Sequence, residues 1–258
     1  PAGAAPEPPR RAAGGEPGDD PAAWPFGDEP LRCFNGWGGF NARGDEYVIR
    51  MPRDGTGSPR LTPRPWVNVL ANARFGSVVS EAGSAYTWCE NAHELRLTPW
   101  HNDPVTDASG EAIYLRDEES GRCWSPSSLP CPGDAPYVTR HGFGVSVFEH
   151  VEDGIESRLQ VFVALDAAVK FSVLTLRNRS PRPRRLSATG YVEWVLGDLR
   201  AKTAPHVVTA VAPDSGALYA RNPYSNDHGD WVGFFVVDDA HRAFSTVSGD
   251  RNEFIGRN

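Results

Sequence analysis

The chain has 258 residues, a length that fits one large all-β domain or two modest domains. Its hydrophobic residues make up 40% of the total, which is enough for a sizeable buried core. The net charge of -7 argues against a nucleic-acid partner, because binding to phosphates requires a basic face. No run of about 18 apolar residues is present, so we expect no membrane contact by this segment.

The first thirty residues differ in composition from the rest of the chain. Residues 1–30 are rich in Pro, Ala, Gly and acidic residues, and such a segment buries too little apolar surface to offset its ordering entropy. We therefore predict a disordered linker over 1–30 and a folded domain over 31–258. The chain begins at Pro1 without a visible signal peptide, so we expect it to be an excerpt from a longer protein.

From residue 31 onward, short alternating apolar runs are separated by Gly, Pro, Asn and Asp, as is typical of antiparallel strands and turns. In the run 155–166, alternation at period two places one apolar set on a single face, namely Leu159, Val161, Val163 and Leu165. No apolar stripe with helical spacing occurs. We predict a large antiparallel β-sandwich of two packed sheets. Its strands are expected in EYVIRM, WVNVLAN, EAIYLRDE, VSVFEHV, IESRLQVFVALD, VKFSVLTLRN, RRLSATGYVEWVLGD, HVVTAVAP, ALYARN and WVGFFVVDD.

One segment, SAYTWCENAHELRLTPWHNDPVTD, departs from the strand pattern and carries the candidate site. Aromatic rings stack on the apolar faces of a pyranose, while planar polar groups satisfy its hydroxyls. The alternative is an ordered loop with mutually paired charges and buried tryptophans. The candidate sugar-binding residues in the segment are Trp88, Glu90, Asn91, His93, Glu94, Arg96, Trp100, Asn102 and Asp103.

A second candidate is the pair Arg140–His141, which places a cation and an imidazole where a sugar or a phosphate could bind. The alternative is a strand-end pair that faces solvent or a carboxylate. A glycosidase acid/base pair among Glu90, Glu94 and Asp103 is not favoured, because spacing along a loop does not establish the separation that hydrolysis needs.

The cysteines are expected to be buried free thiols in a reducing compartment, because none forms a C-x-x-C pair. A Cys123–Cys131 disulfide is the alternative for a secreted protein. A metal site is not favoured, since the one cysteine–histidine spacing that fits a helical turn lies in a region without helical pattern. The four cysteines are Cys33, Cys89, Cys123 and Cys131, and the metal site weighed would use Cys89, His93, His101 and Asp103. We expect no metal and no cofactor.

The order and content of several long motifs resemble glycoside hydrolase family 94, from about Cys33 to Asn258. The likeness is greatest to its β-1,2-glucan branch, the cyclic β-1,2-glucan synthases and 1,2-β-oligoglucan phosphorylases. One departure is Leu95, which stands where the family has a polar residue. The motifs are FNGWGGF, TPRPWVNVLANARFGSVVSEAGSAYTW, ENAHELRLTPWHNDPVTD, GEAIYLRDEESGRCWSP, LTLRNRSPRPRRLSATGYVEWVLG and DRNEFIGRN.

The resemblance implies an N-terminal β-supersandwich followed by a helical linker and an (α/α)₆ barrel. In the family, the barrel carries the general-acid aspartate, and inorganic phosphate is the co-substrate that attacks the anomeric carbon with inversion. Phosphate is itself the nucleophile, so only one protein carboxylate is required. Because this chain lacks the barrel, the resemblance implies a non-catalytic domain of a β-glucan phosphorylase or a cyclic β-1,2-glucan synthase.

The resemblance also implies partners. Family members are homodimers in which the sandwich helps wall the partner's active site, and residues 88–103 with Arg140–His141 are the candidates for that wall. The expected ligand is a β-glucan oligosaccharide, and the expected location is cytoplasmic, or associated with the inner membrane in a synthase. The alternative function is a free-standing carbohydrate-binding module or a structural dimerisation domain.

Overall fold

The computed structural model describes residue 26 and residues 29–54, 57–100, 109–238 and 246–256. Most of the predicted linker therefore lies outside the described residues. Within them, the chain forms antiparallel strands and two short helices, α1 (Arg200–Thr203) and α2 (Arg251–Ile255). This arrangement confirms the predicted all-β antiparallel class.

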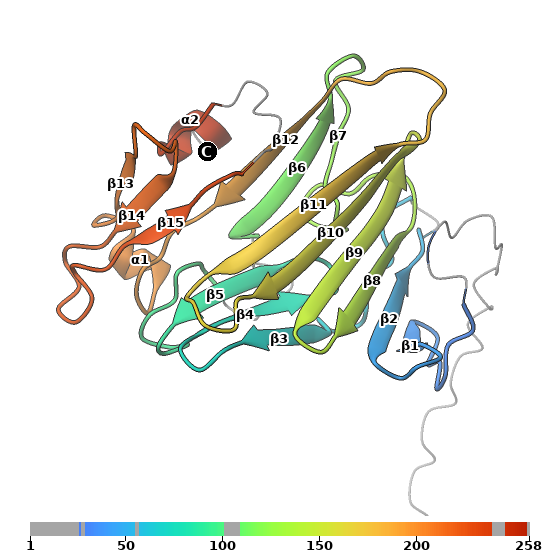
Figure 1. The fold of residues 1–258 in the computed structure, drawn as a ribbon, viewed down its shortest axis with the longest axis horizontal. Coiled ribbons are helices and arrows are strands. Elements are labelled where there is room, and N and C mark those ends of the chain that lie inside the picture. The colour runs from blue at the N-terminus through green and yellow to red at the C-terminus, as the bar shows by residue number, and fades with distance from the viewer. Residues whose placement is uncertain (1–25, 27–28, 55–56, 101–108, 239–245, 257–258) are drawn as a thin grey trace, which may run out of the picture.

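The largest sheet has six strands and forms the long diagonal layer in Figure 1. It contains the three consecutive strands β9, β10 and β11, which pair as two hairpins. Its order is β1 (Gly38–Phe40), β2 (Glu46–Met51), β8 (Tyr137–Gly142), β9 (Val145–Glu152), β10 (Ile155–Val163) and β11 (Lys170–Asn178).

Three smaller sheets complete the described fold, so hydrogen bonding divides the strands into four sheets. One is a meander of β3 (Val67–Ala71), β4 (Phe75–Ser80) and β5 (Ala85–Cys89), which lies at the bottom of Figure 1. Another has the order β12 (Leu186–Val192), β6 (Glu111–Asp117) and β7 (Cys123–Trp124). The last contains β13 (Val208–Val211), β14 (Leu218–Arg221) and β15 (Gly233–Phe235).

The main core lies between the six-stranded sheet and the meander β3–β5. Leu70 and Val79 from the meander pack against Phe148, Leu159 and Val161 from β9 and β10, and all five side chains are buried. Removal of this apolar surface from water is what joins the two layers. The outer face of the meander is thereby left for solvent or for a ligand.

Two details correct the expected alternation. β10 ends at Val163, and Leu165 is 94% exposed, because the chain turns there: the amide of Ala164 donates to the carbonyl of Val169 at the start of the next hairpin arm. In β11, Phe171 and Val173 point outward and are exposed, although their side chains are apolar. The opposite, inward face of this strand carries Lys170 and Leu174.

Candidate functional site

The segment expected to carry the site begins on strand β5, which alternation along the meander places with one face inward and one outward. Ala85 and Cys89 belong to the buried core, and Thr87 between them is also buried. Tyr86 and Trp88 therefore point to the outer face, where both are half-buried. The sequence prediction treated this segment as a loop and did not name Tyr86.

The indole of Trp88 lies flat on the sheet above Gly76 of β4. Gly76 pairs with Trp88 in the register, and a Cβ added to Gly76 would meet ring atoms Cζ2, Cε2 and Cη2 at 2.3, 2.8 and 2.8 Å. Near-equal distances to three neighbouring ring atoms mean that the face of the ring, rather than its edge, covers this glycine. One face of the indole is thus turned to the sheet and the other away from it.

Three aromatic rings form a continuous group on this outer face. The ring centroid of Tyr86 lies 5.5 Å from that of Trp88 and 5.4 Å from that of Trp100, with interplanar angles of 37° and 32°. The guanidinium carbon of Arg96 lies 5.8 Å from the Tyr86 centroid, within the range of a cation–π contact. We call Tyr86, Trp88 and Trp100 the aromatic cluster.

Arg96 holds the far side of the cluster in place. Its Nε donates to the carbonyl of Ala92 at 3.1 Å, and its Nη1 donates to the carbonyl of Trp100 at 3.0 Å. Its backbone also forms bridges to Trp88 and to Gly197. The guanidinium therefore fixes the backbone that carries Trp100, and part of its donor capacity is already used within the chain.

The polar residues between the tryptophans form a compact turn. The side-chain oxygen of Asn91 accepts from the amides of His93 and Glu94 at 2.8 and 3.0 Å, which is a local turn-forming role. His93 Nδ1 lies 2.8 Å from a carboxylate oxygen of Glu94, and both side chains are exposed. Leu95 closes the turn inward and is buried, which explains an apolar residue within the polar segment.

Glu90 lies at the edge of this turn and forms an ion pair with Arg74 from the β3–β4 connection. Its φ of 59° is in the left-handed region, and its amide donates to the carbonyl of Arg74 at 2.6 Å. The predicted candidates Asn102 and Asp103, together with His101, lie outside the described residues.

Arg140 and His141 lie on β8 of the six-stranded sheet rather than in the aromatic cluster. Arg140 forms ion pairs with three carboxylates, those of Glu29, Glu46 and Glu149. Burial opposes its ionisation, but the hydrogen bonds and charges of Glu29 and Glu149 outweigh burial and raise the pKa of Arg140. The guanidinium is thus engaged inside the domain.

His141 is likewise engaged on both ring nitrogens. Its Nε2 lies 3.0 Å from the carbonyl of Trp66, which only accepts, so Nε2 carries the proton and Nδ1 accepts from the Ser146 hydroxyl at 2.9 Å. Burial is the main cause that lowers the pKa of His141 to about 4, against a backbone hydrogen bond that raises it. The imidazole is neutral at pH 7.

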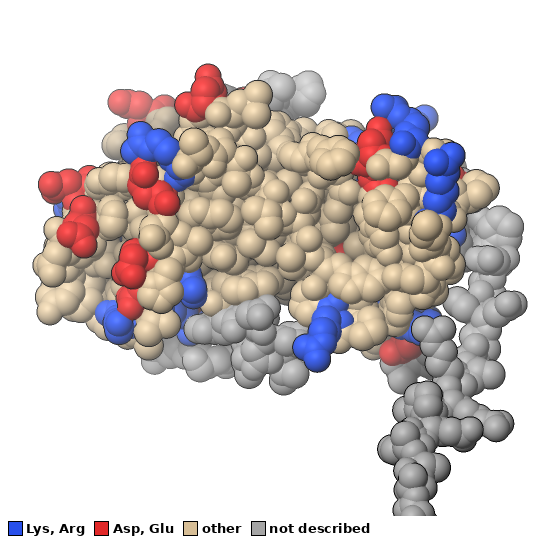
Figure 2. Space-filling view, turned by 90° about the horizontal axis from the view of Figure 1, so that it is seen from below, with Lys and Arg blue, Asp and Glu red and all other residues tan. Residues whose placement is uncertain are grey.

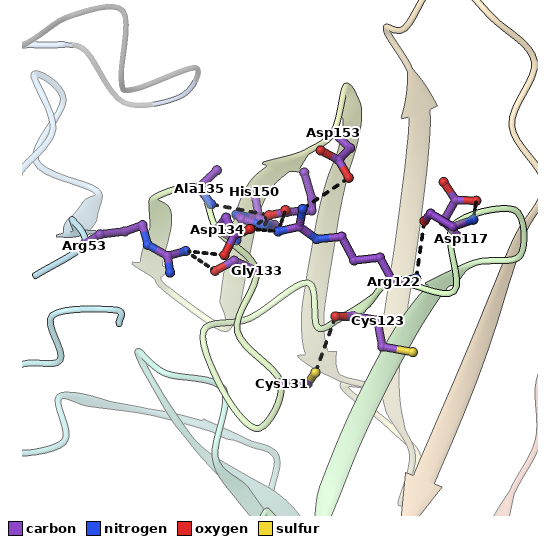
Figure 3. A network of polar contacts seen from close by, with 12 residues as sticks. Arg53, Asp117, Arg122, Cys123, Cys131, Gly133, Asp134, Ala135, His150 and Asp153 are labelled. Atoms are coloured by element: carbon purple, nitrogen blue, oxygen red, sulfur yellow. Dashed lines mark hydrogen bonds and ion pairs between the residues drawn. The ribbon is translucent and has the colours of Figure 1, made fainter. Parts of the chain in front are cut away.

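A larger polar network, which the sequence did not predict, lies at another place in the fold (Figure 3). Arg53 and Arg122 approach Asp134 from opposite sides, and Arg122 also pairs with Asp153 and with the buried Glu152. These partners are far apart in the chain, so spacing gave no signal for the network. It links the chain around Asp134 to the ends of β9 and β10 and is consistent with a structural role.

His150 forms the buried end of this network. Its Nε2 lies 3.0 Å from Glu152, its Nδ1 lies 3.1 Å from the carbonyl of Pro136, and its ring stacks on Tyr137 with centroids 3.8 Å apart. Burial alone would raise the pKa of Glu152, but His150, the amide of Asp134 and Arg122 together lower it. The alternation of His150 and Glu152 on β9 was the available sequence signal.

No group of three or more His, Cys, Asp and Glu side chains suited to a metal occurs among the described residues. All four cysteines are free thiols, although Cys131 Sγ lies 3.6 Å from the carbonyl of Cys123. The expectation that they are buried is wrong for Cys33 and Cys123, which are exposed.

Fold and site together define an antiparallel β-sandwich domain with a half-buried aromatic cluster on the outer face of one sheet. Residues 45–258 match the family model described as the supersandwich domain of glycosyl hydrolase 94. The chain therefore belongs to glycosyl hydrolase family 94, as its motifs predicted.

Known members of the family are similar over most of this chain. It is 40% identical over 228 residues, 88% of its length, to the cyclic β-(1,2)-glucan synthase NdvB of Rhizobium meliloti (strain 1021), of which it covers 8%. It is 30% identical over 227 residues, 85% of its length, to an N,N'-diacetylchitobiose phosphorylase of Vibrio furnissii, of which it covers 27%. A solabiose phosphorylase of Paenibacillus borealis is 30% identical over 168 residues, with 62% of this chain and 20% of that protein covered.

The chain thus spans less than a third of each of these relatives and corresponds to one domain of larger enzymes. Within the described residues, no helix combines the length and the apolar character needed to cross a membrane.

Proposed function

We propose that this chain is a non-catalytic domain that supports the substrate site of an inverting β-glucan phosphorylase or a cyclic β-1,2-glucan synthase. The observation that carries the proposal is the placement of the aromatic cluster on the outer face of a family 94 supersandwich. The 40% identity to a cyclic β-(1,2)-glucan synthase favours β-1,2-glucan as the sugar.

The environment of the carboxylates supports a non-catalytic role. The general acid of a glycoside hydrolase is held in an apolar pocket, which keeps it protonated. A second carboxylate lies on the other side of the glycosidic bond that is cleaved. Glu90 and Glu94 are instead exposed on a turn, and each is paired with a neighbouring basic side chain, Arg74 or His93. In this proposal the general acid belongs to the (α/α)₆ barrel of the whole enzyme, inorganic phosphate is the co-substrate, and no cofactor takes part.

The rings of Trp88 and Trp100 would stack on a sugar, with Arg96 and the turn 90–94 at their margin. The other candidates, Asn102, Asp103, Arg140 and His141, remain proposed contacts in the wall of a homodimer site. For Arg140 and His141, the hydrogen bonds to Glu149 and Glu29 and to Ser146 and Trp66 favour positioning of β8 over a direct sugar contact, since both side chains are engaged within the domain. We propose a cytoplasmic location, at the inner membrane if the whole enzyme is a synthase.

The alternative is a free-standing carbohydrate-binding module. The half-buried state of both tryptophans favours it over a purely structural domain, for which fully buried rings would be expected. A module would bind glucan tightly without a barrel, whereas a supporting domain would bind it weakly.

Calorimetric titration of the purified chain with sophorose and longer β-1,2-glucans tests the proposal. A Trp88→Ala, Trp100→Ala double variant is measured beside it, and both samples are incubated with phosphate and assayed for glucose 1-phosphate. We expect weak binding that the double variant loses, and no sugar phosphate. Tight binding would identify a module in its own right. Release of glucose 1-phosphate would overturn the non-catalytic role.

A further inference from the structure

Two of the free cysteines, Cys123 and Cys131, lie next to each other in the fold. Cys123 is on β7, and the amide of Ser125 donates to the carbonyl of Cys131 at 2.6 Å, which holds the two stretches of chain side by side. The sulfur of Cys131 lies 3.6 Å from the carbonyl oxygen of Cys123, and Figure 3 shows this contact. The pair therefore brings two thiols into one small region of the surface.

Cys123 is the accessible member of the pair. Leu115 of β6 pairs with Trp124 of β7, and both of these side chains are buried in one core cluster. Because side chains alternate along a strand, the preceding Cys123 points to the outer face of the sheet, where it is exposed. Cys131 lies beside it and is half-buried. A reagent in solution thus reaches Cys123 before it reaches Cys131.

The two sulfurs are within reach of each other. A carbonyl oxygen is about 2.4 Å from its own Cα, so the sulfur of Cys131 lies at most about 6 Å from the Cα of Cys123. A disulfide joins two Cα atoms that are themselves about 4.4–6.8 Å apart. The sulfur of Cys123 now lies 3.9 Å from the carbonyl of Gly121, so it must rotate about the Cα–Cβ bond to meet Cys131. An exposed side chain makes such a rotation rapidly.

We propose that Cys123 and Cys131 form a reversible dithiol–disulfide pair that reacts with small disulfides of the glutathione type. The thiolate of Cys123 attacks one sulfur of the small disulfide, the S–S bond of that molecule breaks, and one small thiol leaves. The thiolate of Cys131 then attacks the Cys123 sulfur of the mixed disulfide, and the second small thiol leaves. The protein gives up two protons and two electrons, and the small disulfide takes them up as two thiols.

Arg116 supports the first step. It is the register partner of Cys123 on β6, so the two side chains lie on the same face, and its side chain is 54% exposed. Its ion pair with Glu118 is long, at 4.0 Å, and engages the guanidinium only loosely. A guanidinium attracts the carboxylates of oxidised glutathione, and positive charge beside a thiol favours the thiolate that attacks.

The disulfide would close residues 124–130 into a ring that restrains the connection to the meander. The amide of Leu129 donates to the carbonyl of Ala82 in the β4–β5 turn at 2.9 Å, and Ser127 lies close to Gly83 of the same turn. The meander is on the underside of Figure 1, which Figure 2 shows as a largely uncharged face. Because a disulfide restricts the unfolded chain, we expect oxidation to raise the melting temperature by about 5 °C.

Incubation with oxidised glutathione, followed by alkylation and mass spectrometry of the digested chain, tests the proposal. We expect the unaltered chain to form a Cys123–Cys131 disulfide that retains no glutathione. Cys131→Ser should keep glutathione on Cys123, because no second thiol displaces it, and Cys131→Ala gives the same readout without a hydroxyl group. The exposed Cys33 is the internal control and should keep glutathione in every sample.

Arg116→Gln separates the role of charge from that of geometry. It should slow the reaction with oxidised glutathione about threefold and leave the reaction with the uncharged hydroxyethyl disulfide unchanged. Dithiothreitol should restore the free thiols and the original melting temperature. Glutathione retained on Cys123 of the unaltered chain would overturn the proposal, as would a disulfide between two copies or no reaction at Cys123. Equal melting temperatures before and after oxidation would overturn the restraint on residues 124–130.

Discussion

The ammonium group of Lys170 on β11 contacts the carboxylate of Glu111 on β6, and this ion pair joins two sheets. The Thr87 hydroxyl on β5 lies 2.6 Å from the carboxylate and 2.8 Å from the ammonium, which adds the meander to the junction. Thr98 completes it, 2.6 Å from Glu111. The junction includes Thr87, an inward residue of β5, and the outward residues Tyr86 and Trp88 of the same strand belong to the aromatic cluster. It therefore couples the stability of three sheets to the position of the candidate site.

Loss of one partner of this pair should be costly. Lys170→Met leaves the Glu111 carboxylate buried without its counter-charge, and we expect unfolding free energy to fall by about 3–5 kcal/mol. Urea unfolding followed by circular dichroism measures the change. Adding Glu111→Gln to Lys170→Met removes the uncompensated charge and should restore part of the loss. If the losses in unfolding free energy of the two single variants add up to the loss of the double variant, the pair is not coupled.

Protonation of His141 should destabilise the domain in mildly acidic solution. The unfolded chain has the ordinary pKa of about 6.5 at this histidine, whereas burial lowers the folded pKa to about 4. Between these values the unfolded state binds more protons, so the neutral imidazole stabilises the fold above pH 6.5 and this contribution is lost as the pH falls towards 4. The difference amounts to about 3 kcal/mol.

The measurement compares the unfolding free energies of the unaltered chain and of His141→Gln between pH 7 and pH 4, the range in which the unfolded chain binds more protons than the folded one. Glutamine retains a donor for the Trp66 carbonyl but does not titrate. We expect a markedly smaller decline for the variant. Parallel pH profiles would show that the imidazole is already charged, or accessible, in the folded state.

A second acid-sensitive group should act at lower pH. Two backbone amides, those of Glu119 and Ser120, and the Arg184 guanidinium hold the pKa of Asp117 at about 2, below its ordinary 3.8. Its stabilising contribution is therefore present above pH 3.8 and is lost as the pH falls through about 2. Between pH 3.8 and about 2, the unfolding free energy of Asp117→Asn should fall less steeply than that of the unaltered chain. Asp214→Asn, an exposed turn residue, serves as the control and should follow the unaltered chain.

The sequence predicted the hairpin strands β10 and β11 because apolar and polar residues alternate along both of them. β10 buries Leu159 and Val161 against the meander, and this inward set produces the period of two. β11 reverses the rule: its inward face holds Lys170, and its apolar Phe171 and Val173 are exposed. No local pattern reveals that a lysine points inward when its carboxylate partner lies on another sheet.

The candidate site was predicted in part. The composition of the segment identified Trp88 and Trp100, but Tyr86, the ring between them, was not named because β5 was not recognised as a strand. Alternation of Tyr86 and Trp88 around a buried Thr87 was the missed signal. The paired valines Val69 and Val78 could not be assigned to one face without the register of the meander.

Gly76→Ala should displace the indole that the candidate site depends on. The new Cβ would lie 2.3 Å from Trp88 Cζ2, so the ring must lift from the sheet or the strand must shift. We expect a loss of about 1–3 kcal/mol in unfolding free energy, as in other overpacked sites. Near-ultraviolet circular dichroism should change at the tryptophan bands, and sugar binding should weaken as in the Trp88→Ala, Trp100→Ala double variant. Gly142→Ala is the control, because its Cβ meets no atom closer than 3.4 Å. An unchanged tryptophan spectrum in Gly76→Ala would mean that the indole does not rest on β4.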